Sequence, residues 1–292
     1  MKTLHAFALA LTLPLMGAPV DGNVRSAKAA EPVEFKSASF TIEPSPFKLK
    51  QASKKGITLE PEIYPSIPLT GFLQIPEGQG PFPAVILMHG CAGVEIWNTL
   101  WSERLAAWGY AVLSVDSFTP RGLSYICDGS DVGTASPWGR ALDAFGARAY
   151  LSSLNTIDPA RIAVMGMSHG GASVLEAIQQ ATPAGASTDP FRAAIALYPL
   201  CNPMRQVVTP VLILIGDKDS WVSSDWCAKY VDALPEPHDV TLEIFQGAHH
   251  LFDVEGLDTE ELGLTLRYHA EAAREANALI RSFLTKHLDL SQ

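Results

Sequence analysis

Residues 162–171 read IAVMGMSHGG, an apolar run that leads into a G-x-S-x-G pentapeptide centred on Ser168. The order strand, sharp turn, helix is the context in which this pentapeptide holds a serine hydroxyl above the end of a sheet. Glycines stand two residues on either side, at Gly166 and Gly170, because larger side chains would collide in so tight a turn. The stretch therefore predicts a nucleophilic serine, and the alternative interpretation is a purely structural turn.

Short apolar runs and helical patterns alternate on both sides of this stretch. Most of the runs are too continuously apolar to have one exposed face, which is typical of a mainly parallel sheet covered by helices on both faces. The sequence thus predicts an α/β-hydrolase fold, in the α/β class, with its working site beyond the carboxyl ends of the strands. Expected strands cover residues 69–75, 84–88, 111–115, 162–165, 193–198, 211–215 and 241–245, and expected helices cover 97–108, 139–154, 170–180, 224–233 and 262–287.

A serine hydroxyl is a weak nucleophile at neutral pH, so it needs a base and an acid that orients the base. In this fold the acid and then the histidine follow the serine along the chain. The sixth expected strand is followed by Asp217 and Asp219, and the seventh by His249 and His250. We expect Asp219 to be the acid, because Asp217 follows the strand end too closely and suits the binding of loop amides. Either histidine could be the base, since adjacent side chains point in different directions.

An oxyanion hole must offer two backbone N–H groups to the charge that develops in the transition state, each contributing about 3 kcal/mol. One is expected from His169, the residue after the nucleophile. The other is expected from the loop after the early strand, which reads HGCAG over residues 89–93. Cys91 is the expected second donor, through its backbone, because the neighbouring glycines allow a close approach. Cys91 is not favoured as a nucleophile, since no paired base or helix start accompanies it.

Length, composition and charge narrow the class of protein. The 292 residues, of which 47% are hydrophobic, can bury one large core. We expect one catalytic domain over residues 65–292, preceded by an extended segment over 30–64. The net charge of −10 and the lack of a basic run argue against nucleic-acid binding, which needs Lys and Arg clustered on one surface. No cysteine spacing is typical of a zinc site, and the expected serine chemistry needs neither a metal nor an organic cofactor.

The N-terminus resembles a secretory signal, with Lys2 followed by a mostly apolar run over residues 4–16. The run is shorter than the ~20 apolar residues that a membrane-spanning helix needs. We expect residues 1–29 to be a signal peptide and the protein to be exported to the periplasm or secreted, without a membrane span. The cleavage point stays open, because the A-x-A pattern at 27–29 lies far beyond the apolar run.

The chain holds four cysteines, Cys91, Cys127, Cys201 and Cys227. An even number in an exported chain predicts two disulfides, for which three connectivities are possible. The alternative is buried free thiols, which are common in protein cores.

Several motifs, taken together and in order, resemble the dienelactone hydrolase family. They are HGCAG at 89–93, DPARI at 158–162 leading into GMSHGG at 166–171, GDKD at 216–219 and HLF at 250–252. The resemblance extends over about residues 65–287. It implies the following roles: Ser168 as nucleophile, Asp219 as acid, His250 as base, and Cys91 and His169 as oxyanion donors.

The resemblance also bears on the disulfides and on the reaction. In similar exported proteins, cysteines placed like Cys201 and Cys227 flank the acid loop, which implies that this pair is bridged and leaves Cys91 with Cys127. The founding members of the family use a cysteine nucleophile, whereas this chain has serine. We therefore expect a carboxylesterase acting on a small or medium ester through an acyl-enzyme. The alternatives are a dienelactone or lactone hydrolase, a peptidase or amidase, and a catalytically silent binding protein of the same fold.

Overall fold

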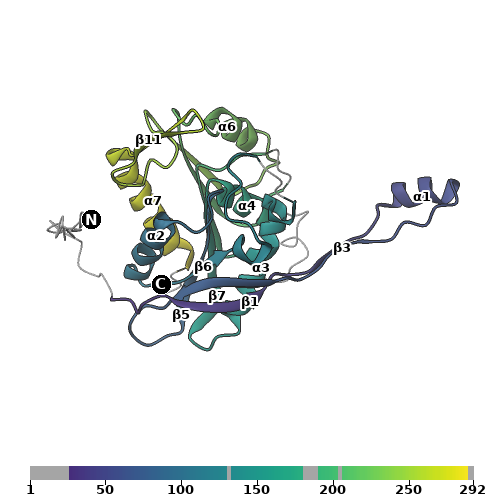
Figure 1. Ribbon diagram of the computed structural model, residues 1–292, viewed down its shortest axis with the longest axis horizontal. Helices are drawn as coiled ribbons and strands as arrows, with labels where there is room; N and C mark the ends of the chain where they lie inside the picture. The colour runs from purple at the N-terminus through teal and green to yellow at the C-terminus, as the bar shows by residue number, and fades with distance from the viewer. Residues whose placement is uncertain (1–25, 130–132, 180–189, 203–205, 289–292) are drawn as a thin grey trace, which may run out of the picture.

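The computed structural model describes residues 26–129, 133–179, 190–202 and 206–288. Its centre is an eight-stranded sheet in the order β1-β4-β6-β5-β7-β8-β9-β10 (Figure 1). From β6 onward, neighbouring strands are parallel, whereas β1 and β4 pair antiparallel at one edge. The bounds are β1 (Glu31–Lys36), β4 (Pro68–Gln74), β5 (Phe82–Met88), β6 (Ala111–Asp116), β7 (Ile157–Met167), β8 (Ala193–Leu197), β9 (Val211–Gly216) and β10 (Val240–Phe245).

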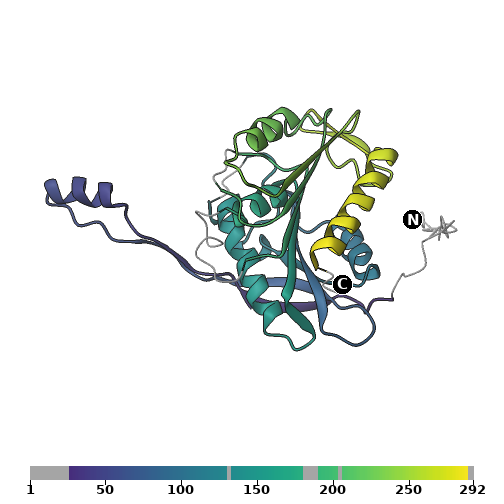
Figure 2. The same cartoon turned by 180° about the vertical axis from the view of Figure 1, so that it is seen from behind.

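Helices cover both faces of the sheet. The helices α3 (Pro137–Ser152) and α4 (His169–Ala177) pack on one face, and α2 (Ile96–Ala107) and α7 (Ala270–Leu288) cover the other (Figure 2). Every residue of β8 and β9 is buried, which explains their continuous apolar sequences. The predicted α/β-hydrolase fold class is confirmed, and α6 (Ser224–Asp232) packs beside β10.

The N-terminal segment differs from the extended approach expected over residues 30–64. Its first part, β1, joins the central sheet by pairing with β4. The rest is an arm that projects from the body, in which β2 (Phe40–Ile42) pairs with β3 (Glu62–Tyr64) and α1 (Pro46–Lys54) lies at the tip (Figure 1). The helix begins after Ser45, whose hydroxyl accepts a hydrogen bond from the amide of Lys48. The expected signal peptide over residues 1–29 lies almost wholly outside the described residues.

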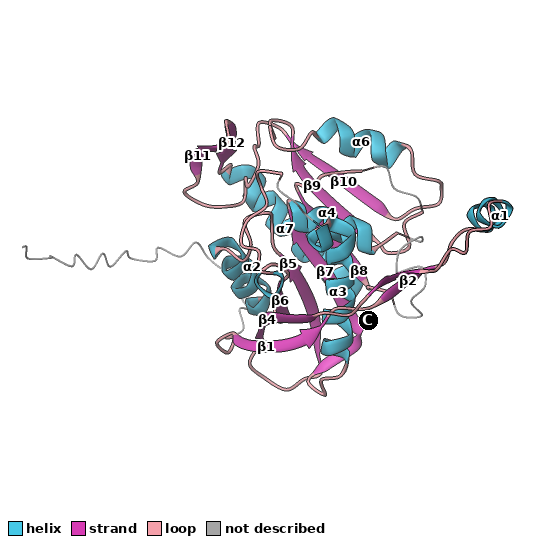
Figure 3. Cartoon of the chain, turned by 45° about the vertical axis from the view of Figure 1, so that its right-hand side comes forward, coloured by secondary structure: helices cyan, strands magenta, loops and turns pink. Residues whose placement is uncertain are grey.

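The C-terminal region corrects one expectation. A helix predicted from about residue 262 begins only at Ala270, and the preceding residues form a hairpin of β11 (Asp258–Glu261) and β12 (Leu264–Arg267) (Figure 3). Leu262 and Gly263 connect the strands, both with positive φ, at 51° and 76°. Such a two-residue turn matches the twist of an antiparallel pair. The apolar residues at alternate positions of this stretch therefore follow a strand period rather than a helical one.

A membrane-spanning helix was not among the expectations. Within the described ranges, no helix combines the length and apolar character needed to cross a bilayer.

Candidate active site

Ser168 lies in the turn between β7 and α4, with backbone angles of φ 53° and ψ −118°. This conformation is strained for a residue with a side chain. The amide of Ser168 donates a hydrogen bond to the Leu197 carbonyl at 2.9 Å, which helps to hold the turn. A Cβ atom at Gly166 would collide with the carbonyl of Gly170, and one at Gly170 with the carbonyl of Met88. Both positions therefore require glycine, because the neighbouring backbone segments leave no room for a side chain.

Three of the predicted side chains meet in one line of hydrogen bonds. His250 Nε2 lies 3.0 Å from Ser168 Oγ, and His250 Nδ1 lies 2.7 Å from Asp219 Oδ2. A neutral imidazole that donates from Nδ1 to the carboxylate leaves Nε2 to accept the serine proton. The structure thus brings His250, and not the adjacent His249, to the serine.

The loop after β9 explains which aspartate takes part. Asp219 Oδ1 accepts hydrogen bonds from the amides of Trp221 and Val222 at 2.9 and 3.0 Å, which fixes the carboxylate. Asp217 instead accepts from the amide of Gly247 at 2.6 Å. The expectation that Asp217 binds loop amides is confirmed.

Two aromatic rings hold the imidazole of His250. Trp221 stacks on it with ring centroids 5.6 Å apart, and Tyr198 meets it edge-on at 4.7 Å. The Tyr198 hydroxyl donates to the buried carboxylate of Asp253 at 2.9 Å, and Trp101 Nε1 donates to the same carboxylate at 2.7 Å. Burial and Asp253 raise the pKa of Tyr198, so it remains a donor. The sequence carries no signal for this support, because its members lie far apart along the chain.

The two expected oxyanion donors lie on facing segments. His169 is the first residue of α4, where backbone N–H groups have no partner within the helix. Cys91 follows β5, and both Cys91 and Ser168 line the same cavity. The approach is close, because a Cβ atom at Gly90 would stand 3.7 Å from the Cβ of Ser168.

Arg140, a buried residue that was not among the predicted site residues, contacts both the segment that contains His169 and the loop that contains Cys91. Arg140 Nη2 donates to the His89 carbonyl at 2.6 Å, and Nη1 lies 2.7 Å from His169 Nδ1. Burial, followed by the charge of Arg140, lowers the pKa of His169 to about 3, so the imidazole is neutral and accepts through Nδ1. Asp143 lies nearby and is paired with Arg121 at 2.8 Å. Charged residues within a helix that is mostly apolar, Arg140 among them, are the one hint that the sequence offers.

The described part of the chain holds two disulfides, and one of them, Cys91–Cys127, lines the cavity. Cys91 is bonded to Cys127, and Cys201 to Cys227, with Cα atoms 4.9 and 5.1 Å apart. These are the two pairs that the resemblance implied. The first joins the loop after β5 to the segment around Ile126, whose amide also donates to the Cys91 carbonyl at 2.9 Å.

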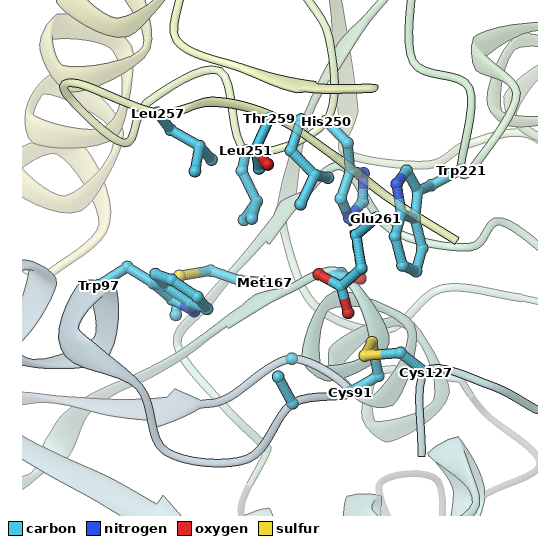
Figure 4. Close-up of a pocket in the computed structure, with 14 residues that line it drawn as sticks. Cys91, Trp97, Cys127, Met167, Trp221, His250, Leu251, Leu257, Thr259 and Glu261 are labelled. Carbon is cyan, nitrogen blue, oxygen red and sulfur yellow. Dashed lines mark hydrogen bonds between the residues drawn. A yellow bond between two sulfur atoms is a disulfide. The ribbon is translucent and has the colours of Figure 1, made fainter. Parts of the chain in front are cut away.

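The serine and histidine open onto a cavity of about 250 Å³. Its wall is mostly apolar, and Figure 4 shows the Glu261 side chain pointing toward the Cys91–Cys127 disulfide. The isolated bridge between His250 and Leu266 places the β11–β12 hairpin directly beside the catalytic candidates. The apolar lining consists of Ala92, Trp97, Met167, Trp221, Leu251, Leu257 and Leu266. Nowhere in the described part of the chain do three or more His, Cys, Asp or Glu side chains cluster as metal ligands would.

Comparison with known proteins places these features in context. The model of the dienelactone hydrolase family matches residues 69–288. Cutinase est2 of Thermobifida alba is 28% identical over 183 residues, which are 62% of this chain and 56% of that protein. A probable 2-oxo-3-(5-oxofuran-2-ylidene)propanoate lactonase of Bradyrhizobium sp is 24% identical over 201 residues, 62% of this chain and 77% of that protein.

Solved structures share the fold. A putative dienelactone hydrolase from Klebsiella pneumoniae superposes with a TM-score of 0.61 at 18% identity, covering 75% of this chain and 93% of that one. A dienelactone hydrolase-like promiscuous phosphotriesterase from metagenomic libraries gives 0.61 at 18% identity, covering 89% and 99%. The chain spans a little over half the length of the first curated relatives that it matches, 56% to 60%.

Proposed function

Because this chain belongs to the dienelactone hydrolase family, we propose that it is a serine hydrolase that cleaves carboxylic esters. One observation carries the proposal: His250 stands between Ser168 and Asp219, with its two ring nitrogens 3.0 and 2.7 Å from their oxygens. This is the arrangement in which a histidine activates a serine hydroxyl and a carboxylate holds the resulting imidazolium. The strained backbone of Ser168 adds support, because such strain is retained where function requires it.

The reaction proceeds in two halves. Ser168 Oγ attacks the ester carbonyl as His250 Nε2 takes its proton, and the amides of Cys91 and His169 stabilise the oxyanion. His250 then returns the proton to the departing alcohol, which leaves an acyl group on Ser168. Water, activated by the same imidazole, releases the acid and regenerates the serine. Asp219 keeps Nδ1 protonated throughout and stabilises the imidazolium.

The cavity and the relatives favour esters over other substrates. A mostly apolar space of about 250 Å³ suits a small or medium acyl or alkyl group. The relatives named cutinase and lactonase support ester and lactone bonds, and lactone hydrolysis is the second candidate. A peptidase or amidase is less favoured, since the described residues form no propeller or large lid that would select peptides.

The compartment belongs to the same proposal. Two disulfides suit an oxidising environment, in keeping with export to the periplasm or the exterior. The expected signal peptide over residues 1–29 is the means of that export. N-terminal sequencing of protein recovered from each cell fraction tests this part: unprocessed protein in the cytoplasm alone would contradict it.

Kinetics on a substrate panel test the activity. The panel contains p-nitrophenyl acetate, butyrate and octanoate, a lactone, and a p-nitroanilide. We expect the esters to react fastest, and Ser168→Ala to lower their turnover by about 10⁴-fold or more. Ser153→Ala, at the remote end of α3, is the matched control and should retain full activity. Full activity in Ser168→Ala, or faster cleavage of the anilide than of the esters, would overturn the proposal.

A further inference from the structure

The β11–β12 hairpin forms a polar part of the cavity wall. Along β11, Thr259 and Glu261 line the cavity, whereas Asp258 and Glu260 do not. This alternation follows the two-residue period of a strand. Asp258 is paired with Arg267 of β12 at 2.8 Å. The carboxylate of Glu261 is therefore the one in the hairpin that lines the cavity.

A hydrogen bond fixes Glu261 in that position. The Tyr125 hydroxyl donates to Glu261 Oε1 at 2.6 Å. Tyr125 lies two residues before Cys127, so this bond connects the hairpin with the disulfide-bearing loop. The hydrogen bond to Glu261 raises the pKa of Tyr125 to about 12, which keeps the phenol protonated as the donor.

No cationic side chain accompanies the Glu261 carboxylate in the described part of the cavity wall. Among the described residues, no Lys or Arg lines the cavity, and none forms an ion pair with Glu261. Of the described residues that line the cavity, His250 and Glu261 are the ionisable ones. Asp128 is near enough to Tyr125 to contribute to the raised pKa of that phenol. One wall of the cavity thus presents a carboxylate with no cationic partner among the described lining residues.

We propose that Glu261 determines specificity, so that the site selects esters carrying a positive charge near the scissile group and rejects anionic esters. The inference rests on the proposed ester hydrolysis and adds the substrate class. A cationic head group would lie against the Glu261 carboxylate. The indole faces of Trp97 and Trp221, which share the cavity, would add cation–π attraction. An anionic group would meet the same carboxylate, with no Lys or Arg among the described residues of the wall.

The competing role for Glu261 is a structural one, in which it serves only to tie the hairpin to Tyr125. Variants separate the two roles. Glu261→Gln keeps a carbonyl oxygen that can accept from Tyr125 but removes the charge. Tyr125→Phe removes the hydrogen bond to Glu261 but keeps the negative charge of Glu261. Glu260→Gln is the matched control, because it removes one negative charge from the exposed side of the same strand.

The experiment compares three thioesters of butyrate on the full chain: butyrylthiocholine, its neutral isostere 3,3-dimethylbutyl thiobutyrate, and the anionic 3-(butyrylthio)propanoate. At low ionic strength we expect kcat/KM for the cation to exceed that for the neutral isostere by about tenfold. Glu261→Gln should remove most of this preference and should raise kcat/KM for the anion, relative to that for the neutral ester, by about fivefold or more. Glu260→Gln should stay within about twofold on all three.

Two results would overturn the inference. One is an equal change on all three substrates in Glu261→Gln, which indicates a structural role. The other is an equal effect of Glu260→Gln and Glu261→Gln on the preference for the cation. Such a result would mean that the preference comes from the net charge of the protein and not from Glu261. Calorimetric binding of the same compounds to Ser168→Ala reports selection without turnover, and the same tenfold preference is expected there. Loss of ester hydrolysis with preserved cation binding would contradict the proposed function and leave the Glu261 inference standing.

Discussion

Arg140 donates one hydrogen bond to His169 Nδ1, at 2.7 Å, and another to the backbone carbonyl of His89, at 2.6 Å. His169 begins the helix after the serine, and His89 begins the loop that contains Cys91. A single buried side chain thus connects the two segments from which the oxyanion donors are expected. Its effect on the reaction would be indirect, through the positions of those amides.

Replacing Arg140 with methionine tests this positioning role. We expect kcat to fall by about 10- to 100-fold with little change in KM, because misplaced amides stabilise the transition state less while the apolar cavity still binds substrate. The free energy of unfolding should also fall, by about 1–3 kcal/mol for each of the two buried acceptors, His169 Nδ1 and the His89 carbonyl, that loses its hydrogen bond. Arg161→Met, at the far end of β7 where Arg161 pairs with Asp158, is the control. A rise in KM at constant kcat would assign Arg140 to substrate binding instead.

The low pKa of His169 predicts an acid-sensitive fold. Burial and then Arg140 lower this pKa from 6.5 to about 3. Between these two values the unfolded chain binds a proton that the folded chain does not, so the free energy of unfolding falls as the pH falls. The contribution is at most about 1.4 kcal/mol per pH unit. His169→Gln, which can still accept from Arg140, should therefore show a shallower loss of stability between pH 6 and 4 in urea titrations. Slopes identical to those of the unaltered protein would refute the assignment.

The two disulfides should contribute similarly to stability but differently to activity. They close loops with sequence separations of 36 and 26 residues. Replacing either pair by alanine should lower the free energy of unfolding by about 3–4 kcal/mol. Only the Cys91→Ala/Cys127→Ala protein should lose much kcat/KM below the melting range, because that bond lines the cavity and holds the Cys91 loop. Denaturant curves and ester kinetics on both double variants check this, and equal losses of kcat/KM would contradict it.

Tyr198→Phe separates the ring of this tyrosine from its hydroxyl. The ring still packs on His250, so kcat/KM should stay within about threefold, while Asp253 loses one of its two side-chain donors. We expect the free energy of unfolding to fall by about 1–3 kcal/mol. A large loss of kcat with unchanged stability would show that the hydroxyl acts in the reaction.

The sequence predicted the centre of the fold well and its periphery poorly. Strands such as β8 and β9 are buried on both faces, so their apolar runs are distinct from everything around them. The edge strand β1 has one buried residue, Phe35, and gives no such run. The β11–β12 hairpin depends on positive φ at Leu262, which residue type does not predict.

The same distinction applies to the site. Ser168, Asp219 and His250 follow strand ends in a fixed order, so their meeting could be expected from the sequence. Asp253 and Glu261 could not be identified in this way. Their partners Trp101 and Tyr125 lie 152 and 136 residues away, and only the folded chain brings them together.

Covalent labelling of Ser168 tests the central claim most directly. The folded full-length protein is treated with a fluorophosphonate, and the adduct is located by intact-mass and peptide mass spectrometry. We predict one phosphonyl group per chain, on Ser168, with a rate that falls by about 10³-fold or more in His250→Ala and with no label in Ser168→Ala. An unlabelled Ser168 in folded protein, or stoichiometric labelling of another residue, would contradict the account.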